Sequence, residues 1–354
     1  MKKKNRVLMC CSELSVKGGM VSVVKNYLGY KNWDNYEIIY VPTHTEKNKL
    51  VVAIFFACAY IKILFLAIFG KISIAHLHTA ERGSFFRKAI LVRTLHKFGI
   101  KTILHHHAAE FEEFYASLND KTKKFVIETL EMADLNIVLS KRLIPMISDK
   151  ARKAKIRVLY NAVPTFESNP YNIKNRNCLF MGRLGKRKGI YDLLNSIKKI
   201  DEILPKDVQF YLCGDGEVEE TKQYIDKLNI GNRIAYIGWV DGAKKKQILS
   251  RTAINILPSY NEGLPMSILE AMSYGIPNIA TNIASIPEVI KPGVNGYLIE
   301  PGDIDSLAAS IIELMANDSL RYEMGKNAFN LIANEFSLDN HICNLKQIYT
   351  DLLE

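Results

Sequence analysis

Two carboxylates, Glu262 and Glu270, are separated by seven residues in a segment that follows a short apolar run. Gly263 marks a turn between them, and Pro265 suits the first turn of a helix that the pattern predicts over 266–274. A strand, a turn with glycine and a helix N-terminus together present backbone N–H groups to an anion. A carboxylate beside them can accept hydrogen bonds from hydroxyl groups. The segment therefore predicts a site for a nucleotide sugar.

A basic turn with Arg183 and Lys188 is a second candidate site, for binding an anion. It follows an apolar run and precedes a helical pattern that begins near Gly189. Two cations there can neutralise a diphosphate leaving group, and each charge-assisted contact contributes roughly 1.5–3 kcal/mol. A solvated turn without a ligand is the alternative. The sequence holds no Asp-x-Asp pair flanked by strand residues, so we expect chemistry without a metal.

Glycines and histidines supply further candidates near the N-terminus. Gly18 and Gly19 follow the first apolar run, and glycine lets the backbone approach a phosphate or sugar closely; an ordinary turn is the alternative. The histidines at 105–107 end another run, but neighbouring strand residues point to opposite faces, so we expect no metal cluster there. His76 and His78 end a third run, where either could line an acceptor site or be structural.

The elements that must position these residues follow a regular alternation. The chain has 354 residues, 48% of them hydrophobic and 24% charged, which suits two globular domains. Apolar runs alternate with helical patterns, restart after a polar stretch at 167–177, and end in a helix at about 338–352. This alternation is typical of doubly wound parallel sheets, which bind ligands at the carboxyl ends of their strands. The predicted strands are 6–11, 37–41, 72–75, 102–104, 135–139, 157–159, 178–181, 209–213, 234–237, 254–257, 278–280 and 296–299.

The segment around Glu262 and Glu270, with Gly275-Ile-Pro277 after it, resembles the signature of family-4 retaining glycosyltransferases of GT-B fold. Other segments resemble the same family, in its order and over nearly the whole chain. These are Gly18-Gly19, Asn161, Gly182-Arg183-Leu184 with Lys188-Gly189, Gly214-Asp215-Gly216, Gly293-Val-Asn-Gly296 and Pro301-Gly302-Asp303.

The resemblance implies an α/β fold of two Rossmann-like, doubly wound domains that face a cleft. Residues 1–165 would form the acceptor side, 166–336 would bind the nucleotide sugar, and 337–354 would cross back as a helix onto the first domain. The implied reaction is retaining and metal-independent transfer of a sugar from a UDP- or GDP-linked donor, without a separate cofactor. The implied acceptor is a glycan or polyprenyl-diphosphate-linked glycan of bacterial surface polysaccharide synthesis.

The resemblance also implies roles for individual residues. Glu262 would hold the transferred sugar, His107 would face the donor sugar, and Arg183 and Lys188 would neutralise the diphosphate. Trp239, which follows a predicted strand, would flank the base or belong to the core. The donor would be bound by Gly18, Gly19, Arg183, Lys188, Gly214, Trp239, Gly263, Leu264, Met266 and Glu270, the last at the ribose. Glu110 is a weaker candidate for contact with the acceptor.

Two other classes of function suit this type of fold. One is a sugar-nucleotide epimerase, which the intact pair Glu262 and Glu270 argues against. The other is a non-catalytic nucleotide-sugar-binding subunit, which the presence of Arg183 and Lys188 argues against.

Residues 50–69 are apolar except for Lys62, and a helix of that length would be about 30 Å long, enough to cross a bilayer. Three placements remain open: a helix across the membrane, a helix buried in the domain, and a helix on the membrane surface with lysines near the head groups. Crossing would separate the first strand from its partners.

Charge and cysteine content point to partners and compartment. The net charge is +10, because the first 165 residues carry +14 and the remainder carries −4, and no nucleic-acid recognition motif is present. An anionic membrane surface or a phosphate-bearing acceptor is therefore the expected partner, not nucleic acid. The six cysteines contain no Cys-x-x-Cys, so we expect buried free thiols in a reducing, cytoplasmic compartment. The basic first half and the apolar segment at 50–69 lead us to expect a peripheral position on the inner face of the cell membrane.

Overall fold

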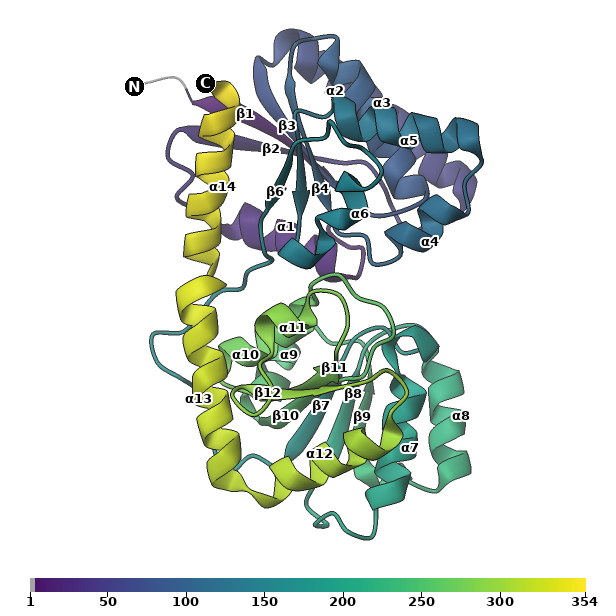
Figure 1. Ribbon diagram of the computed structural model, residues 1–354, viewed down its shortest axis with the longest axis vertical. Coiled ribbons are helices and arrows are strands. Elements are labelled where there is room, and N and C mark those ends of the chain that lie inside the picture. The colour runs from purple at the N-terminus through teal and green to yellow at the C-terminus, as the bar shows by residue number, and fades with distance from the viewer. Residues whose placement is uncertain (1–3) are drawn as a thin grey trace. The chain divides into compact units, whose positions relative to one another are not determined.

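The computed structural model describes residues 4–354, and they form two compact units (Figure 1). Unit 1 joins the chain up to Asn161 with Leu338–Glu354, and unit 2 is Ala162–Ser337. Each unit is built on one parallel sheet of six strands with helices around it, which confirms the predicted pair of doubly wound α/β sheets.

The sheet of unit 1 has the strand order β2-β1-β3-β4-β5-β6. Its strands are β1 (Asn5–Cys11), β2 (Tyr36–Pro42), β3 (Ile72–Thr79), β4 (Lys101–His106), β5 (Leu135–Val138) and β6 (Ile156–Val158). Its helices are α1 (Gly19–Gly29), α2 (Lys49–Phe69), α3 (Gly83–His96), α4 (Phe111–Ala116), α5 (Asp120–Met132), α6 (Pro145–Ser148), α14 (Leu338–Leu353) and the 3-10 turn η1 (Lys141–Leu143).

The sheet of unit 2 has the strand order β12-β11-β10-β7-β8-β9. Its strands are β7 (Asn177–Met181), β8 (Gln209–Cys213), β9 (Ile234–Gly238), β10 (Thr252–Leu257), β11 (Asn278–Thr281) and β12 (Gly296–Ile299). Its helices are α7 (Ile190–Ile200), α8 (Val218–Leu228), α9 (Gly242–Ser250), α10 (Met266–Ser273), α11 (Ile286–Val289), α12 (Ile304–Ala316) and α13 (Asp318–Glu335), with 3-10 turns η2 (Lys186–Lys188) and η3 (Gly231–Arg233).

The last helix, α14, supplies part of the core of unit 1. Its Tyr349 is fully buried and its hydroxyl lies 2.7 Å from Nδ1 of His76 in β3. Its His341 is bonded to the hydroxyl of Tyr27 in α1. Unit 1 is therefore assembled from the two ends of the described chain.

Two expectations about local structure were wrong. The strands run further than predicted: β3 continues past residue 75 through His76 and His78 to Thr79, and β4 continues past residue 104 to His106. The cysteines are all free, as predicted, but Cys58 and Cys343 are exposed rather than buried.

Helix α2 is not a core helix, although its composition allowed that placement. Among its residues only Ala59 and Ile63 are buried. Within the described residues it is the one helix long and apolar enough to cross a membrane, and 11% of its most apolar stretch is buried. The fold thus leaves most of an apolar helix exposed.

Candidate active site

The candidate residues of unit 2 stand at the carboxyl ends of four neighbouring strands, β10, β7, β8 and β9. In that order the ends lead to Glu262, to Arg183 and Lys188, to Gly214, and to Trp239. Parallel strands bring residues from distant parts of the chain to one sheet edge, where doubly wound folds bind ligands.

Backbone hydrogen bonds tie these strand ends together. The N–H of Gly182 donates to the carbonyl of Cys213 at 3.0 Å, and that of Gly214 donates to the carbonyl of Gly238 at 2.9 Å. A Cβ on Gly214 would lie 1.8 Å from the oxygen of Gly182. Glycine is therefore required at position 214 because the two turns touch through their backbones.

Lys188, Glu262 and Ser259 form a nearly buried polar cluster. The ammonium of Lys188 is bonded to Oε1 of Glu262, and the hydroxyl of Ser259 donates to the same oxygen at 2.8 Å. The side chains of Lys188 and Glu262 are 15% and 5% exposed. Ser259 had no predicted role, although it stands at the start of the segment that carries Glu262. The structure thus joins the predicted phosphate cation and the predicted sugar carboxylate in one ion pair.

Gly189 closes the turn that carries Lys188. Its φ is +70°, in the left-handed region, and a Cβ there would lie 1.9 Å from the carbonyl oxygen of Pro258. The loop after β7 and the loop after β10 therefore touch at this glycine, and their contact places Lys188 beside Glu262.

We expect Gly189→Ala to destabilise the protein by at least about 3 kcal/mol, because left-handed strain and a backbone clash add. Gly293→Ala is the matched control: its φ is +74° but nothing lies within 4 Å of a Cβ there. Urea unfolding measures the loss of stability in both variants. Gly293→Ala reports the left-handed backbone strain alone, and the additional loss in Gly189→Ala reports the clash with Pro258. Equal losses in the two would contradict the role assigned to the Pro258 contact.

Arg183 is exposed at the end of β7. Its side chain lies against Gly216, where a Cβ would come within 2.8 Å of its Cγ, and Gly216 has a φ of +101°. Because Gly216 has no side chain, the side chain of Arg183 can extend past it. Arg183 and Lys188 therefore both lie at the carboxyl end of the sheet.

Glu270 lies in α10, one turn inside the helix, and Oε1 accepts a hydrogen bond from the ammonium of Lys245 at 2.6 Å. Lys245 belongs to α9 and had no predicted role, because a run of three lysines gives no sign of which one faces a carboxylate. Trp239 is 39% exposed after β9, so it does not belong to the core.

The start of α10 differs slightly from its prediction. Pro265 caps the helix instead of occupying its first turn, and Met266 is the first helical residue. Gly263, Leu264 and Met266 are buried in the loop and first turn that follow Glu262. The positive end of α10 therefore lies directly after the Glu262 turn, as a site for an anion requires.

The N-terminal candidates lie in unit 1. Gly18 is the N-cap of α1, with a φ of +138°, and a Cβ there would meet nothing within 4 Å. Gly19 is exposed as the first residue of α1. Nε2 of His107 lies 2.9 Å from Nδ1 of His78, and burial lowers the pKa of His107, which is therefore neutral at pH 7. Glu110 is paired with Arg82 at 3.3 Å.

Three buried histidines approach one another closely, but their rings are poorly placed to share an ion. Nitrogens of His76, His78 and His105 lie within 4.8 Å of one another. The rings of His76 and His78 are stacked, 4.5 Å apart and 8° from parallel. A metal ligand directs its lone pair in the plane of the ring, so parallel stacked rings do not converge on one ion. His76 instead bonds to His105 at 3.0 Å.

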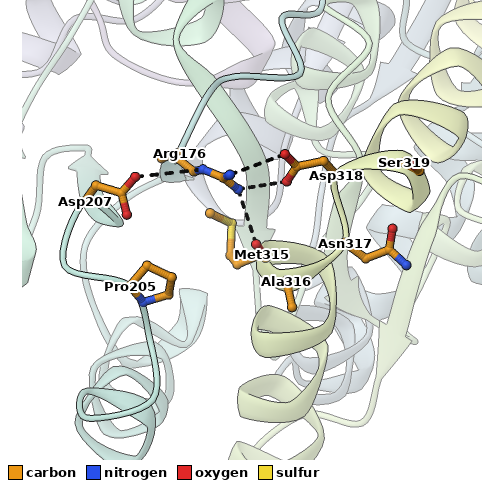
Figure 2. Close-up of a pocket in the computed structure, with 8 residues that line it drawn as sticks. All are labelled: Arg176, Pro205, Asp207, Met315, Ala316, Asn317, Asp318 and Ser319. Carbon is orange, nitrogen blue, oxygen red and sulfur yellow. Dashed lines mark hydrogen bonds and ion pairs between the residues drawn. The ribbon is translucent and has the colours of Figure 1, made fainter.

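A cavity of about 500 Å³ lies at the other edge of the same sheet, before the amino end of β7 (Figure 2). Arg176 points into it and donates to Asp318 at 2.8 Å, with Asp207 at 3.9 Å on its other side. Because two carboxylates already neutralise the guanidinium, this cavity is a poor site for an anionic donor.

Comparison with known proteins agrees with this geometry. Residues 164–331 match the family model of glycosyl transferases group 1. The chain is 26% identical to an uncharacterized 41.2 kDa protein in the cps region of Klebsiella pneumoniae, over 95% of this chain and 97% of that one. It is 27% identical to a UDP-Gal:alpha-D-GlcNAc-diphosphoundecaprenol alpha-1,3-galactosyltransferase of Escherichia coli, over 80% and 76%.

The crystal structure of HepE from Anabaena in complex with UDP has the same fold. It superposes with a TM-score of 0.76 at 17% identity and covers 98% of this chain and all of that one. The GT-B fold expected from the sequence is thereby confirmed. Residues 164–331 match the glycosyl transferases group 1 and, together with the named glycosyltransferases among the relatives, identify the protein as a glycosyltransferase.

Proposed function

We propose that this glycosyltransferase is retaining and metal-independent, and that it moves a sugar from a UDP- or GDP-linked donor to a glycan or polyprenyl-diphosphate-linked acceptor. The observation that carries the proposal is the ion pair of Lys188 and Glu262 between the loops after β7 and β10, with Arg183 at the same edge. Lys188, the proposed cation for a diphosphate, is hydrogen-bonded to Glu262, the proposed carboxylate for a sugar.

The hydrogen-bonding capacity of the pair allows both groups to act together. An ammonium has three N–H donors, so Lys188 can keep one on Glu262 and offer two to phosphate oxygens. Oε1 of Glu262 already accepts from Ser259 and Lys188, so Oε2 is the oxygen for a sugar hydroxyl. Glu270 would accept from the ribose, Trp239 would flank the base, and the start of α10 would face the sugar and phosphate.

In the reaction, the bond between C1 of the sugar and the diphosphate oxygen breaks while an acceptor hydroxyl oxygen bonds to C1 on the same face. The hydroxyl proton passes to the departing diphosphate, whose charge Arg183 and Lys188 stabilise. Their cations act where charge develops, which is the contribution of preorganised groups to catalysis. Exclusion of water would protect the donor from hydrolysis.

The acceptor class and the place of action are also proposals. The relative from Escherichia coli is named for a diphosphoundecaprenol acceptor and the relative from Klebsiella for a cps region. These names support a lipid-linked glycan of a bacterial surface polysaccharide as acceptor. An enzyme with such an acceptor would work in the cytoplasm, peripheral on the inner face of the cell membrane.

A panel of nucleotide sugars, incubated with the protein and membrane extract and followed by mass spectrometry for transfer and by NMR for sugar configuration, tests the proposal. Transfer of sugar mass to a lipid-extractable product with retained anomeric configuration supports it. Interconversion of the free sugar nucleotide would instead indicate an epimerase, and binding without turnover would indicate a non-catalytic subunit.

Activity should persist within about twofold in excess EDTA, because two cations occupy the place in which a metal would neutralise the diphosphate. Initial rates with and without chelator measure this. Loss of activity that magnesium or manganese restores would contradict the proposed leaving-group chemistry.

A further inference from the structure

Helix α2 carries a continuous apolar stripe on its outward face. Ile61 and Phe65 are 66% and 62% exposed. The stripe consists of Leu50, Ile54, Ile61, Phe65, Ile68 and Phe69, which recur at helical spacing along one side. A helix on the surface of a soluble domain ordinarily turns charged residues outward, so this face is built for an apolar neighbour.

The inward face of α2 fixes how that stripe is presented. Ala59 and Ile63 are buried in the core of unit 1, and Phe56 and Leu66 pack against it. The hydroxyls of Tyr60 and Thr94, in α3, lie 3.0 Å apart. Because these contacts hold one side of α2 on unit 1, the outward stripe has a defined orientation.

The sheet rules out a membrane-crossing α2 in this fold. β2 precedes α2 and β3 follows it, and both pair in parallel with β1. A helix that crossed a bilayer would leave its two ends on opposite sides, and β1 could then not pair with both strands. The apolar stripe must therefore meet its neighbour while the helix lies along a surface.

The charges along α2 identify that neighbour. Residues 47–71 contain Lys47, Lys49, Lys62 and Lys71 and no Asp or Glu. Lys62 is exposed within the outward face itself. Two copies of this face packed together would bring lysines near one another without an acidic partner. Anionic lipid head groups provide both the counter-charge and the apolar layer beneath it.

We propose that the outward face of α2 is a docking surface for an anionic membrane, with the helix parallel to the bilayer and its apolar stripe among the acyl chains. The inference goes beyond the transfer reaction, although it rests on the proposed function in one respect: a docked unit 1 would stand where a lipid-linked acceptor is found.

The test measures binding of the purified full-length chain to sedimented vesicles, without donor or acceptor. Vesicles of phosphatidylcholine with about one third phosphatidylglycerol are compared with phosphatidylcholine alone. We expect Ile61→Ser with Phe65→Ser to weaken binding roughly 100-fold, since two large apolar side chains no longer enter the bilayer. Ile203→Ser with Val294→Ser is the matched control, because these residues are 64% and 51% exposed in unit 2. It should bind as the wild type does.

The lysines are tested by Lys49→Gln with Lys62→Gln, which should reduce the preference for anionic vesicles. High salt should release part of the bound protein and detergent all of it, because salt screens only the ionic contribution. Equal binding of the serine variant and the wild type would overturn the proposal. The proposal would also be overturned if light scattering showed that the wild type and the control variant are dimers and the serine variant is a monomer. Because the assay contains no sugar donor, its result tests membrane docking independently of the proposed sugar transfer.

Discussion

Lys188→Ala and Arg183→Ala should each lower the rate of sugar transfer by roughly 10²–10³-fold. This is the usual effect of losing one preorganised group that stabilises developing charge. Both cations stand at the carboxyl end of β7, and Lys188 is bonded to Glu262. Steady-state kinetics with the identified donor measure the loss. Lys186→Ala is the matched control, because Lys186 is an exposed cation of the same turn and should keep nearly full activity.

Stability must be measured beside activity in these variants. Lys188→Ala leaves Glu262 nearly buried without its cation, which ordinarily costs several kcal/mol. The double variant Lys188→Ala with Glu262→Gln removes that unpaired charge and should recover stability without recovering activity. Arg183 is exposed, so Arg183→Ala should fold as the wild type does. Near-wild-type rates in both single variants would remove these cations from the diphosphate site.

Acid should unfold unit 1 at a pH where unit 2 is still folded. Burial lowers the pKa of His76 and His107 to about 3 and that of His106 and His341 to about 4, and it places the pKa of His78 and His105 well below the ordinary value. All six stay neutral in the folded chain but gain a proton near pH 6.5 when unfolded. Their stabilisation is therefore complete above pH 6.5 and is lost as the pH falls toward the folded values.

The expected loss is large. At pH 5.5, relative to pH 7, each of these histidines lowers the free energy of unfolding by about 1 kcal/mol, and the six together lower it by on the order of 6–7 kcal/mol. That is comparable with the whole stability of a domain, about 5–15 kcal/mol. All eight histidines of the chain belong to unit 1. Unit 2 therefore has no histidine whose protonation could lower its stability in this pH range.

The two tryptophans report the two units separately. Trp33 is buried in unit 1 against Tyr349, and Trp239 belongs to unit 2. Urea unfolding of the single-tryptophan variants at pH 7.5 and 5.5 should shift strongly for Trp33 and little for Trp239. His96→Gln, at an exposed position, should leave the shift unchanged, whereas His106→Gln should reduce it by about one sixth. An unfolding midpoint, followed by Trp33, that is the same at pH 7.5 and pH 5.5 would contradict the prediction.

The sequence predicted the sheets well because buried parallel strands are nearly continuous apolar runs. It failed where polar residues continue a strand. The run at 72–75 ended at His76 in the prediction, yet β3 continues because Tyr349, 273 residues away, supplies a partner for that imidazole. A partner so distant leaves no signal in the local pattern.

The candidate site shows the same division. Glycine, proline and acidic spacing located the turn at Glu262 because backbone geometry limits which residues fit there. The bond between Lys188 and Glu262 joins residues 74 positions apart, and that between Lys245 and Glu270 joins two elements that meet only in the fold. Side-chain pairing across loops depends on tertiary packing, which spacing along the chain does not encode.

Helix α14 closes the core of unit 1 with residues that are synthesised after the whole of unit 2. Unit 2 is continuous, from Ala162 to Ser337, and is complete in sequence before α14 emerges from the ribosome. At 5–20 residues per second, unit 1 waits roughly 10–40 s for its last helix. The unit that begins first therefore matures last, and its buried aromatic and histidine side chains stay uncovered in the nascent chain while the other unit folds.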